Sequence, residues 1–195
     1  MHYDPSGLMF ADTMMSPEQP TQTSQEEMVN VAEKRHCLPC TACCQGWLRA
    51  TIHGHSVGAG KACPYSCPSG CAIYAERPED PCRSFICSWL VEGSPLPEWM
   101  RPDQSGAIVW LSLPWQGQLV ISANPVGRAI PEPTLEWLKQ YAQEHRRPLI
   151  YYERIVTDGS FSGLKRFGFG SAEFRQKVTR LAAEEANLDI EMHSG

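Results

Sequence analysis

The stretch Cys37-Leu38-Pro39-Cys40-Thr41-Ala42-Cys43-Cys44 decides how this chain folds. It opens a region, residues 37–87, that contains all nine cysteines of the 195-residue chain. Cys-x-x-Cys is a common chelating unit, because a tight turn lets both sulfurs face one ion, and two such units overlap here. The concentration of thiols and their spacing therefore predict metal binding.

The rest of this region is irregular in sequence. Its other cysteines are Cys63, Cys67, Cys71, Cys82 and Cys87. Prolines and glycines interrupt residues 37–90 repeatedly, so helices and strands alone cannot hold the segment, and metal cross-links would supply the missing constraint. The adjacent residues Cys43 and Cys44 are expected to point in different directions, which makes them the branching point between two ligand sets.

Two metal chemistries fit the spacing. Eight of the nine thiolates divide into two tetrahedral sites of four, which suits structural zinc. The triple Cys37-x2-Cys40-x2-Cys43 also occurs in bacterial ferredoxins, so an iron–sulfur cluster with spare thiols fits equally well. The simplest alternative is that some cysteines are small buried apolar residues. A thiol redox enzyme is disfavoured, because the stretch lacks the strand and helix N-terminus that usually frame that motif.

The order of these motifs resembles the CxxCxxCC family, a group of mostly bacterial proteins with a zinc- or iron-chelating domain. The resemblance covers residues 37–90 and rests on Cys37-x2-Cys40-x2-Cys43-Cys44, Cys63, Gly70-Cys71-Ala72-Ile73-Tyr74, Arg77-Pro78 and Cys82-Arg83-x-Phe85. It implies chelation through Cys37, Cys40, Cys43, Cys44, Cys63, Cys71, Cys82 and Cys87. Cys67 lies outside the pattern. A related domain occurs in flagellin lysine-N-methylases. The predicted function is therefore zinc chelation, and the alternative is an iron–sulfur protein with a redox or protein-modification role.

Arginines beside the cysteines are candidates for charge compensation. Four thiolates on one divalent metal leave a net negative charge, so guanidinium groups at Arg77 and Arg83 would stabilise the site. Ordinary surface arginines paired with carboxylates are the alternative. Arg49 is a weaker candidate of the same kind.

Histidines and aromatic residues also accompany the cysteines. His53 and His55 would face the same side of a strand and could ligate a metal, although the cysteines already provide enough ligands. The aromatic residues are expected to pack around the metal and exclude water. They are Trp47, Tyr74, Phe85 and Trp89.

The sequence becomes periodic after Pro95 and Pro97. Gln116-Gly117 and Asp158-Gly159 are hairpin signals. The predicted elements are strands at 106–113, 118–123, 149–156 and 161–169, and helices at 131–145 and 171–188. Their order, β-β-α-β-β-α, predicts an α+β fold in which a small antiparallel sheet with two helices follows the irregular, metal-stabilised half.

Three segments follow from these patterns. Residues 1–23 are expected to be a disordered tail. Residues 24–95 should contain a helix, from Ser24 to about His36, and the cysteine-rich metal-chelating region. Residues 96–195 should form the α+β region, packed on the chelating region as one compact unit.

Charge and composition narrow the function classes. The formal net charge of −5 disfavours nucleic acid and anionic membranes as partners. Residues 1–30 contain no lysine or arginine and no apolar core of signal-peptide length. We therefore expect a cytoplasmic protein, where clustered cysteines bind metal more often than they form disulfides. No phosphate-binding loop or serine nucleophile motif is present, and enzymatic activity, a protein partner and the oligomeric state stay open.

Overall fold

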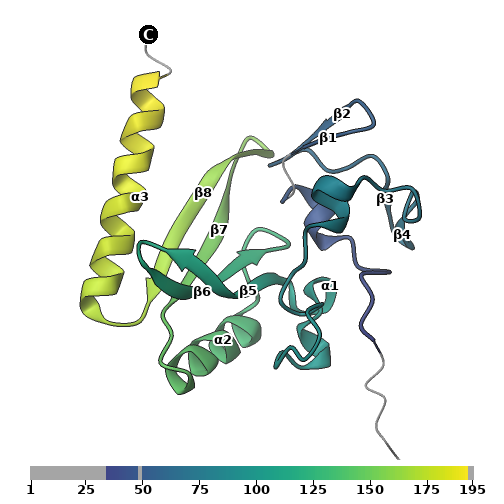
Figure 1. The fold of residues 1–195 in the computed structure, drawn as a ribbon. Helices are drawn as coiled ribbons and strands as arrows, with labels where there is room; N and C mark the ends of the chain where they lie inside the picture. The colour runs from purple at the N-terminus through teal and green to yellow at the C-terminus, as the bar shows by residue number, and fades with distance from the viewer. Residues whose placement is uncertain (1–33, 48–49, 193–195) are drawn as a thin grey trace, which may run out of the picture. The chain divides into compact units, whose positions relative to one another are not determined.

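A mixed four-stranded sheet dominates the C-terminal half of the protein in the computed structural model, which describes residues 34–47 and 50–192 (Figure 1). Its strands are β5 (Ala107–Trp115), β6 (Gln118–Pro125), β7 (Leu149–Thr157) and β8 (Ser160–Phe169), side by side in that order. Helix α2 (Glu132–Glu144) connects β6 to β7, and helix α3 (Ala172–Met192) follows β8. The predicted order of elements and the α+β class are confirmed.

Two tight turns set the hairpins of this sheet. The φ angles are 49° at Gln116 and 82° at Gly117, and 52° at Asp158 and 75° at Gly159. Positive φ at both central residues of a two-residue turn matches the natural twist of the paired strands. Both turns lie where the sequence predicts them, and β5–β6 and β7–β8 accordingly pair antiparallel.

The central pair of strands differs from the prediction of an antiparallel sheet. β6 and β7 pair in parallel, with Ile121 opposite Leu149. Helix α2 returns the chain from the end of β6 to the end of the sheet at which β6 begins. A helical crossover of this kind joins neighbouring parallel strands. The sheet is therefore antiparallel only in its two outer pairs.

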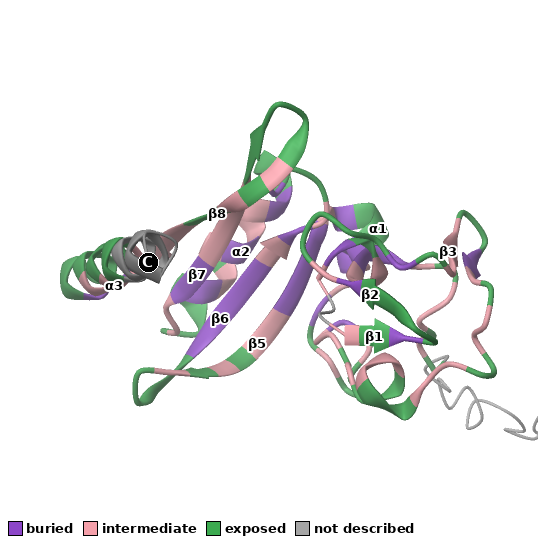
Figure 2. Ribbon diagram, turned by 90° about the horizontal axis from the view of Figure 1, so that it is seen from above, coloured by how far each residue is buried: buried purple, intermediate pink, exposed green. Residues whose placement is uncertain are grey.

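The two helices pack on opposite faces of the sheet. Ile121 shares a buried cluster with Leu138 of α2, whereas its neighbour Val120 shares another with Val178 of α3. Consecutive residues of a strand point to opposite faces, so this alternation along β6 creates both contacts. Figure 2 shows that the buried positions follow the central strands.

The cysteine-rich half contains only short elements. Two hairpins are formed by β1 (Ala50–Ile52) with β2 (His55–Val57), and by β3 (Ser66–Cys67) with β4 (Gly70–Cys71). Single helical turns lie at Ala42–Gln45, Glu79–Arg83 and Glu98–Met100, and the short helix α1 spans Pro102–Ser105. This irregularity agrees with the density of proline and glycine in the sequence.

Residues just after Cys87 attach this half to the sheet. The Ser88 amide donates to the Val109 carbonyl at 2.9 Å, and the Leu111 amide donates to Ser88 Oγ at 2.8 Å, so the segment covers the outer edge of β5. Trp89 enters the buried cluster of the α2 face, and Arg35 donates to its carbonyl at 2.8 Å. Cys87 therefore sits at the junction between the irregular half and the sheet.

The N-terminal predictions fall mainly on residues that the structure does not describe. The predicted tail, residues 1–23, and the predicted helix up to residue 33 lie outside the described residues. Lys34, Arg35 and His36 are described and are not helical, so the predicted helix does not reach His36. The described residues from Lys34 onward belong to one compact unit. In this part of the chain no helix combines the length and apolarity that a membrane span requires.

Leu138 provides a test of the core. It is 0% exposed between α2 and the sheet, so Leu138→Ala should lower the free energy of unfolding by about 2–5 kcal/mol. Leu119→Ala is the matched control, because Leu119 is 49% exposed and its truncation should cost less than about 1 kcal/mol. Urea unfolding followed by circular dichroism measures both, and equal losses would contradict this packing.

Candidate functional site

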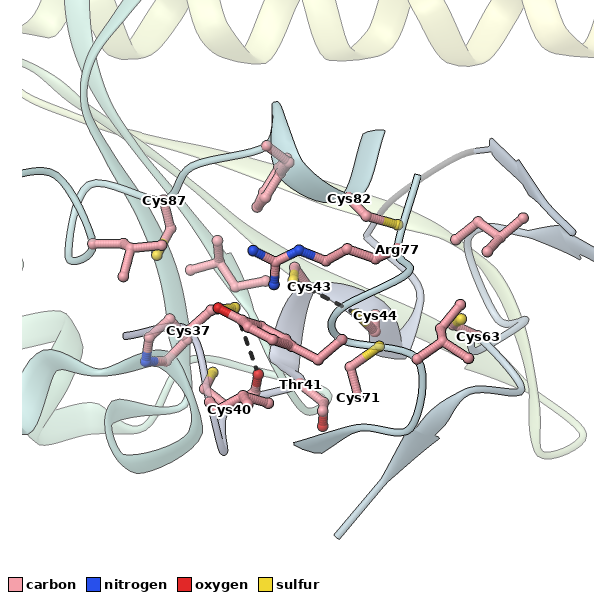
Figure 3. A pocket seen from close by; sticks show the side chains of 18 of the residues that line it. Cys37, Cys40, Thr41, Cys43, Cys44, Cys63, Cys71, Arg77, Cys82 and Cys87 are labelled. Atoms are coloured by element: carbon pink, nitrogen blue, oxygen red, sulfur yellow. Dashed lines mark hydrogen bonds between the residues drawn. The ribbon is translucent and has the colours of Figure 1, made fainter. Parts of the chain in front are cut away.

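A small pocket in the irregular half is lined by cysteine side chains together with apolar and aromatic ones (Figure 3). Its cysteines are Cys37, Cys40, Cys43, Cys44, Cys63, Cys71, Cys82 and Cys87. These are the eight residues that the sequence singles out as ligands. The structure thus brings together side chains up to 50 positions apart, from Cys37 to Cys87.

The first loop brings four of these cysteines to the pocket. Cys37 and Cys40 precede the 3-10 turn Ala42–Gln45, which contains Cys43 and Cys44. Successive side chains leave such a turn about 120° apart, so the two adjacent cysteines diverge from the backbone. Their sulfurs nevertheless lie 3.9 Å apart.

A glycine allows the other loops to close on the first one. Gly70 has a φ of 122°, and a Cβ atom there would collide with the Leu38 side chain. Only glycine adopts this backbone without strain, and only glycine leaves room for so close an approach. The hairpin that holds Cys71 can therefore lie directly against the loop between Cys37 and Cys40.

Burial keeps most of these thiols protonated in the metal-free protein. Desolvation raises the pKa of Cys40 to about 11, and it also raises the pKa of Cys37, Cys82 and Cys87. Cys44 differs, because the hydrogen bond from Cys43, followed by the charge of Arg77, lowers its pKa to about 7. The same hydrogen bond, together with burial, raises the pKa of Cys43.

Backbone N–H groups oppose this effect at three of the cysteines. Hydrogen bonds from Ala42 to Cys40, from Ile73 to Cys71, and from Leu90 and Trp89 to Cys87 each act to lower the pKa of the thiol. The donors lie two or three residues after the cysteine, so each turn points its own amides at its sulfur. Such bonds favour the charged form and prepare a thiolate for a cation.

Arg77 lies inside the pocket. Figure 3 shows its side chain running past Cys82 towards Cys43. The guanidinium stacks on the Tyr74 ring at 3.7 Å, and its buried Nε has no hydrogen-bond partner among the described residues. A guanidinium so placed adds positive charge to a pocket of thiols.

Arg83 has a different position from Arg77. Its guanidinium donates to the Ala75 carbonyl at 2.8 Å and the Arg77 carbonyl at 3.1 Å. It is exposed and does not line the pocket. Arg83 therefore braces the loop that holds Arg77. Arg49 lies outside the described residues.

The candidate histidines and Cys67 do not line the pocket. His53 and His55 are exposed, and their rings contact the edge of Tyr65 at centroid distances of 5.7 and 5.8 Å. The Cys67 thiol donates to the Gly70 carbonyl at 3.0 Å. Of the four aromatic residues, Tyr74, Phe85 and Trp89 line the pocket and Trp47 does not.

The sulfurs converge on the pocket without forming a closed coordination sphere. No three Cys, His, Asp or Glu side chains within residues 34–47 and 50–192 are arranged to hold a metal ion. Side-chain rotation would have to bring further sulfurs together before one ion could be bound tetrahedrally here.

The local sequence did not predict all of the residues that line the pocket. Ile108 of β5 and Pro102 of α1 contribute to the wall, although both belong to the C-terminal half. The structure also places the Asp103 amide against the Cys40 sulfur. Such contacts arise from the docking of the two halves, which the spacing of cysteines does not report.

Comparison with known proteins adds no relative: the chain matches no protein-family model, no curated protein and no solved structure. Its function must be inferred from the site itself.

The pKa of Cys44 predicts a selective reaction. In reduced, chelator-treated protein, Cys44 should be alkylated by iodoacetamide with a midpoint near pH 7, because the thiolate is the nucleophile and is populated above its pKa. Cys40, with a pKa of about 11, should stay unmodified at that pH. Peptide mass spectrometry measures both rates.

Arg77→Met is the control for this reaction. Removing the charge of Arg77 should move the Cys44 midpoint to higher pH, because that charge stabilises the thiolate. Labelling of all pocket cysteines together near pH 9 would show that the described environment of Cys44 is wrong.

Proposed function

We propose that this protein chelates zinc through eight cysteines in two tetrahedral thiolate sites, which hold the irregular half in its folded form. The observation that supports this most directly is the selective lining of one pocket by eight cysteines, with Cys67 outside it. Cys67 does not line this pocket, and its thiol donates a hydrogen bond to the Gly70 carbonyl at 3.0 Å.

The size of the pocket favours ions over an organic substrate. Its volume is about 60 Å³. Ligand pockets usually measure about 300–1,000 Å³, whereas a cavity that holds one water molecule needs about 10–15 Å³. The space between the sulfurs therefore suits metal ions and is too small for an organic substrate of ordinary size.

The donor set and its surroundings fit zinc. Structural zinc takes four cysteine thiolates, and when bound it supplies the positive charge that makes buried thiolates favourable. The backbone amides at Cys40, Cys71 and Cys87 would donate to the bound thiolates. The unpartnered Nε of Arg77 would find a sulfur acceptor and offset part of the negative charge.

The proposed compartment is the cytoplasm, where thiols stay reduced. All nine cysteines are free in the structure, as zinc ligation requires. The alternative function is an iron–sulfur protein with a redox or protein-modification role. It would use Cys37, Cys40 and Cys43 with one further thiolate and would leave the remaining pocket cysteines without a metal.

Metal analysis tests this function. Protein purified without oxygen should be colourless and contain about two zinc ions per chain, because eight thiolates fill two sites of about four. Cys67→Ser should keep this stoichiometry, and Cys63→Ser should reduce it or weaken zinc retention against a chelator. Brown protein with iron and acid-labile sulfide would favour the alternative, and metal-free protein would reject both.

Zinc removal should affect the two halves of the chain unequally. The irregular half has few ladders of its own, so its amides should lose protection from hydrogen exchange when a strong chelator removes the metal. Amides of the sheet core, such as Val120 and Ile150, should stay protected because α3 and the sheet bury them. Protection should return when zinc is added back, and unchanged exchange in the cysteine loops would contradict a structural role.

A further inference from the structure

The pocket cysteines fall into two groups, and Cys43 and Cys44 lie where the groups meet. Figure 3 shows Cys63, Cys71, Cys82 and Cys44 on one side, and Cys37, Cys40 and Cys87 on the other. The Arg77 side chain crosses between the two sides towards Cys43. This arrangement subdivides a pocket that the sequence presents only as one dense cluster.

Several contacts define the first group. The Cys63 amide donates to the Cys44 carbonyl at 2.8 Å, so these two loops run side by side. Cys44 and Cys82 both pack against the buried cluster that contains Cys63 and Ile52. The Ser66 amide donates to the Cys63 carbonyl at 3.1 Å, and Ser66 pairs with Cys71 in the β3–β4 hairpin, which places Cys71 close to Cys63 in the fold.

Different contacts define the second group. The Cys37 thiol donates to the Cys40 carbonyl at 3.8 Å. Cys43 follows Cys40 along the first loop and lies near the middle of the pocket in Figure 3. Cys87 packs against the separate core cluster of the α2 face. Figure 3 places Cys87 and Cys37 on the same side of the pocket.

We propose that one metal ion is held by Cys44, Cys63, Cys71 and Cys82, a second by Cys37, Cys40, Cys43 and Cys87, and that Arg77 lies between them. This inference rests on the proposed function. Because the Cys43 and Cys44 sulfurs are 3.9 Å apart, the two ions would be close neighbours, and one guanidinium would compensate the charge of both thiolate sets.

The two sites have different structural consequences. The first group joins only loops of the irregular half, from Cys44 to Cys82. The second group ties the first loop to Cys87, and the next residue, Ser88, is bonded to β5. The second metal therefore fastens the irregular half to the sheet, and the first metal organises that half internally.

Three double variants of the full-length chain test this grouping, and each removes two thiols. Cys63→Ser with Cys82→Ser should leave about one zinc ion per chain, and so should Cys37→Ser with Cys87→Ser, since each pair damages a single site of about four thiolates. Cys63→Ser with Cys87→Ser should leave almost none, because it damages both sites. A cross-pair that retains one zinc, or a within-group pair that loses both, would overturn the grouping.

A second measurement needs no substitution, so it decides the question even if a variant misfolds. Metal-free, reduced wild-type protein receives one equivalent of zinc and is then alkylated, and mass spectrometry identifies the protected cysteines. In each molecule that holds one zinc ion, the protected cysteines should be the four members of a single group, either the first or the second. Mixed sets, such as Cys43 and Cys44 protected together in one site, would overturn the grouping while leaving the proposed function intact.

Failure of the proposed function itself gives a separate result. In that case wild-type protein would bind no zinc, and added zinc would protect no cysteine. Arg77→Met distinguishes the role of the guanidinium: both zinc ions should still bind, but a chelator should extract them several-fold faster than from wild type. Unchanged extraction would remove Arg77 from the proposal.

Discussion

A buried thiolate is unfavourable unless a positive charge or hydrogen-bond donors accompany it, and the irregular half of this protein is built around that constraint. Burial raises the pKa of Cys40 and Cys87, yet backbone amides point at both sulfurs. Arg77 adds a cation whose buried Nε has no hydrogen-bond partner within the part of the chain that the structure describes. Backbone amides and Arg77 thus favour thiolates in the pocket, and a metal ion, if bound there, would add further positive charge.

The sheet provides a stable surface on which the irregular half packs. Buried side chains on both of its faces hold α2 and α3. The segment that follows Cys87 covers the outer edge of β5. This contact shields the edge strand from pairing with a strand of another molecule. The chain therefore combines a conventional hydrophobic core with an irregular half that contains short hairpins and single helical turns.

The position of each arginine and histidine illustrates why local pattern is a weak guide to a site. Arg77 and Arg83 flank Cys82 in sequence, but only Arg77 reaches the pocket, because Arg83 is engaged by two backbone carbonyls. His53 and His55 pack against Tyr65 instead of the cysteines. Each outcome depends on loop conformations that neighbouring residues in sequence do not specify.

The sequence by itself determined the features that depend on neighbouring residues. The turns at Gln116-Gly117 and Asp158-Gly159 and the four strands and two helices α2 and α3 of the C-terminal half follow from local spacing and backbone preference, and the choice of eight candidate cysteines follows from the resemblance of their order to a known family. Only the tertiary structure decided the parallel pairing of β6 with β7, the entry of Ile108 into the pocket wall and the division of the thiols about Arg77. These depend on how distant segments pack, because close contact between residues far apart in the chain is set by the whole fold.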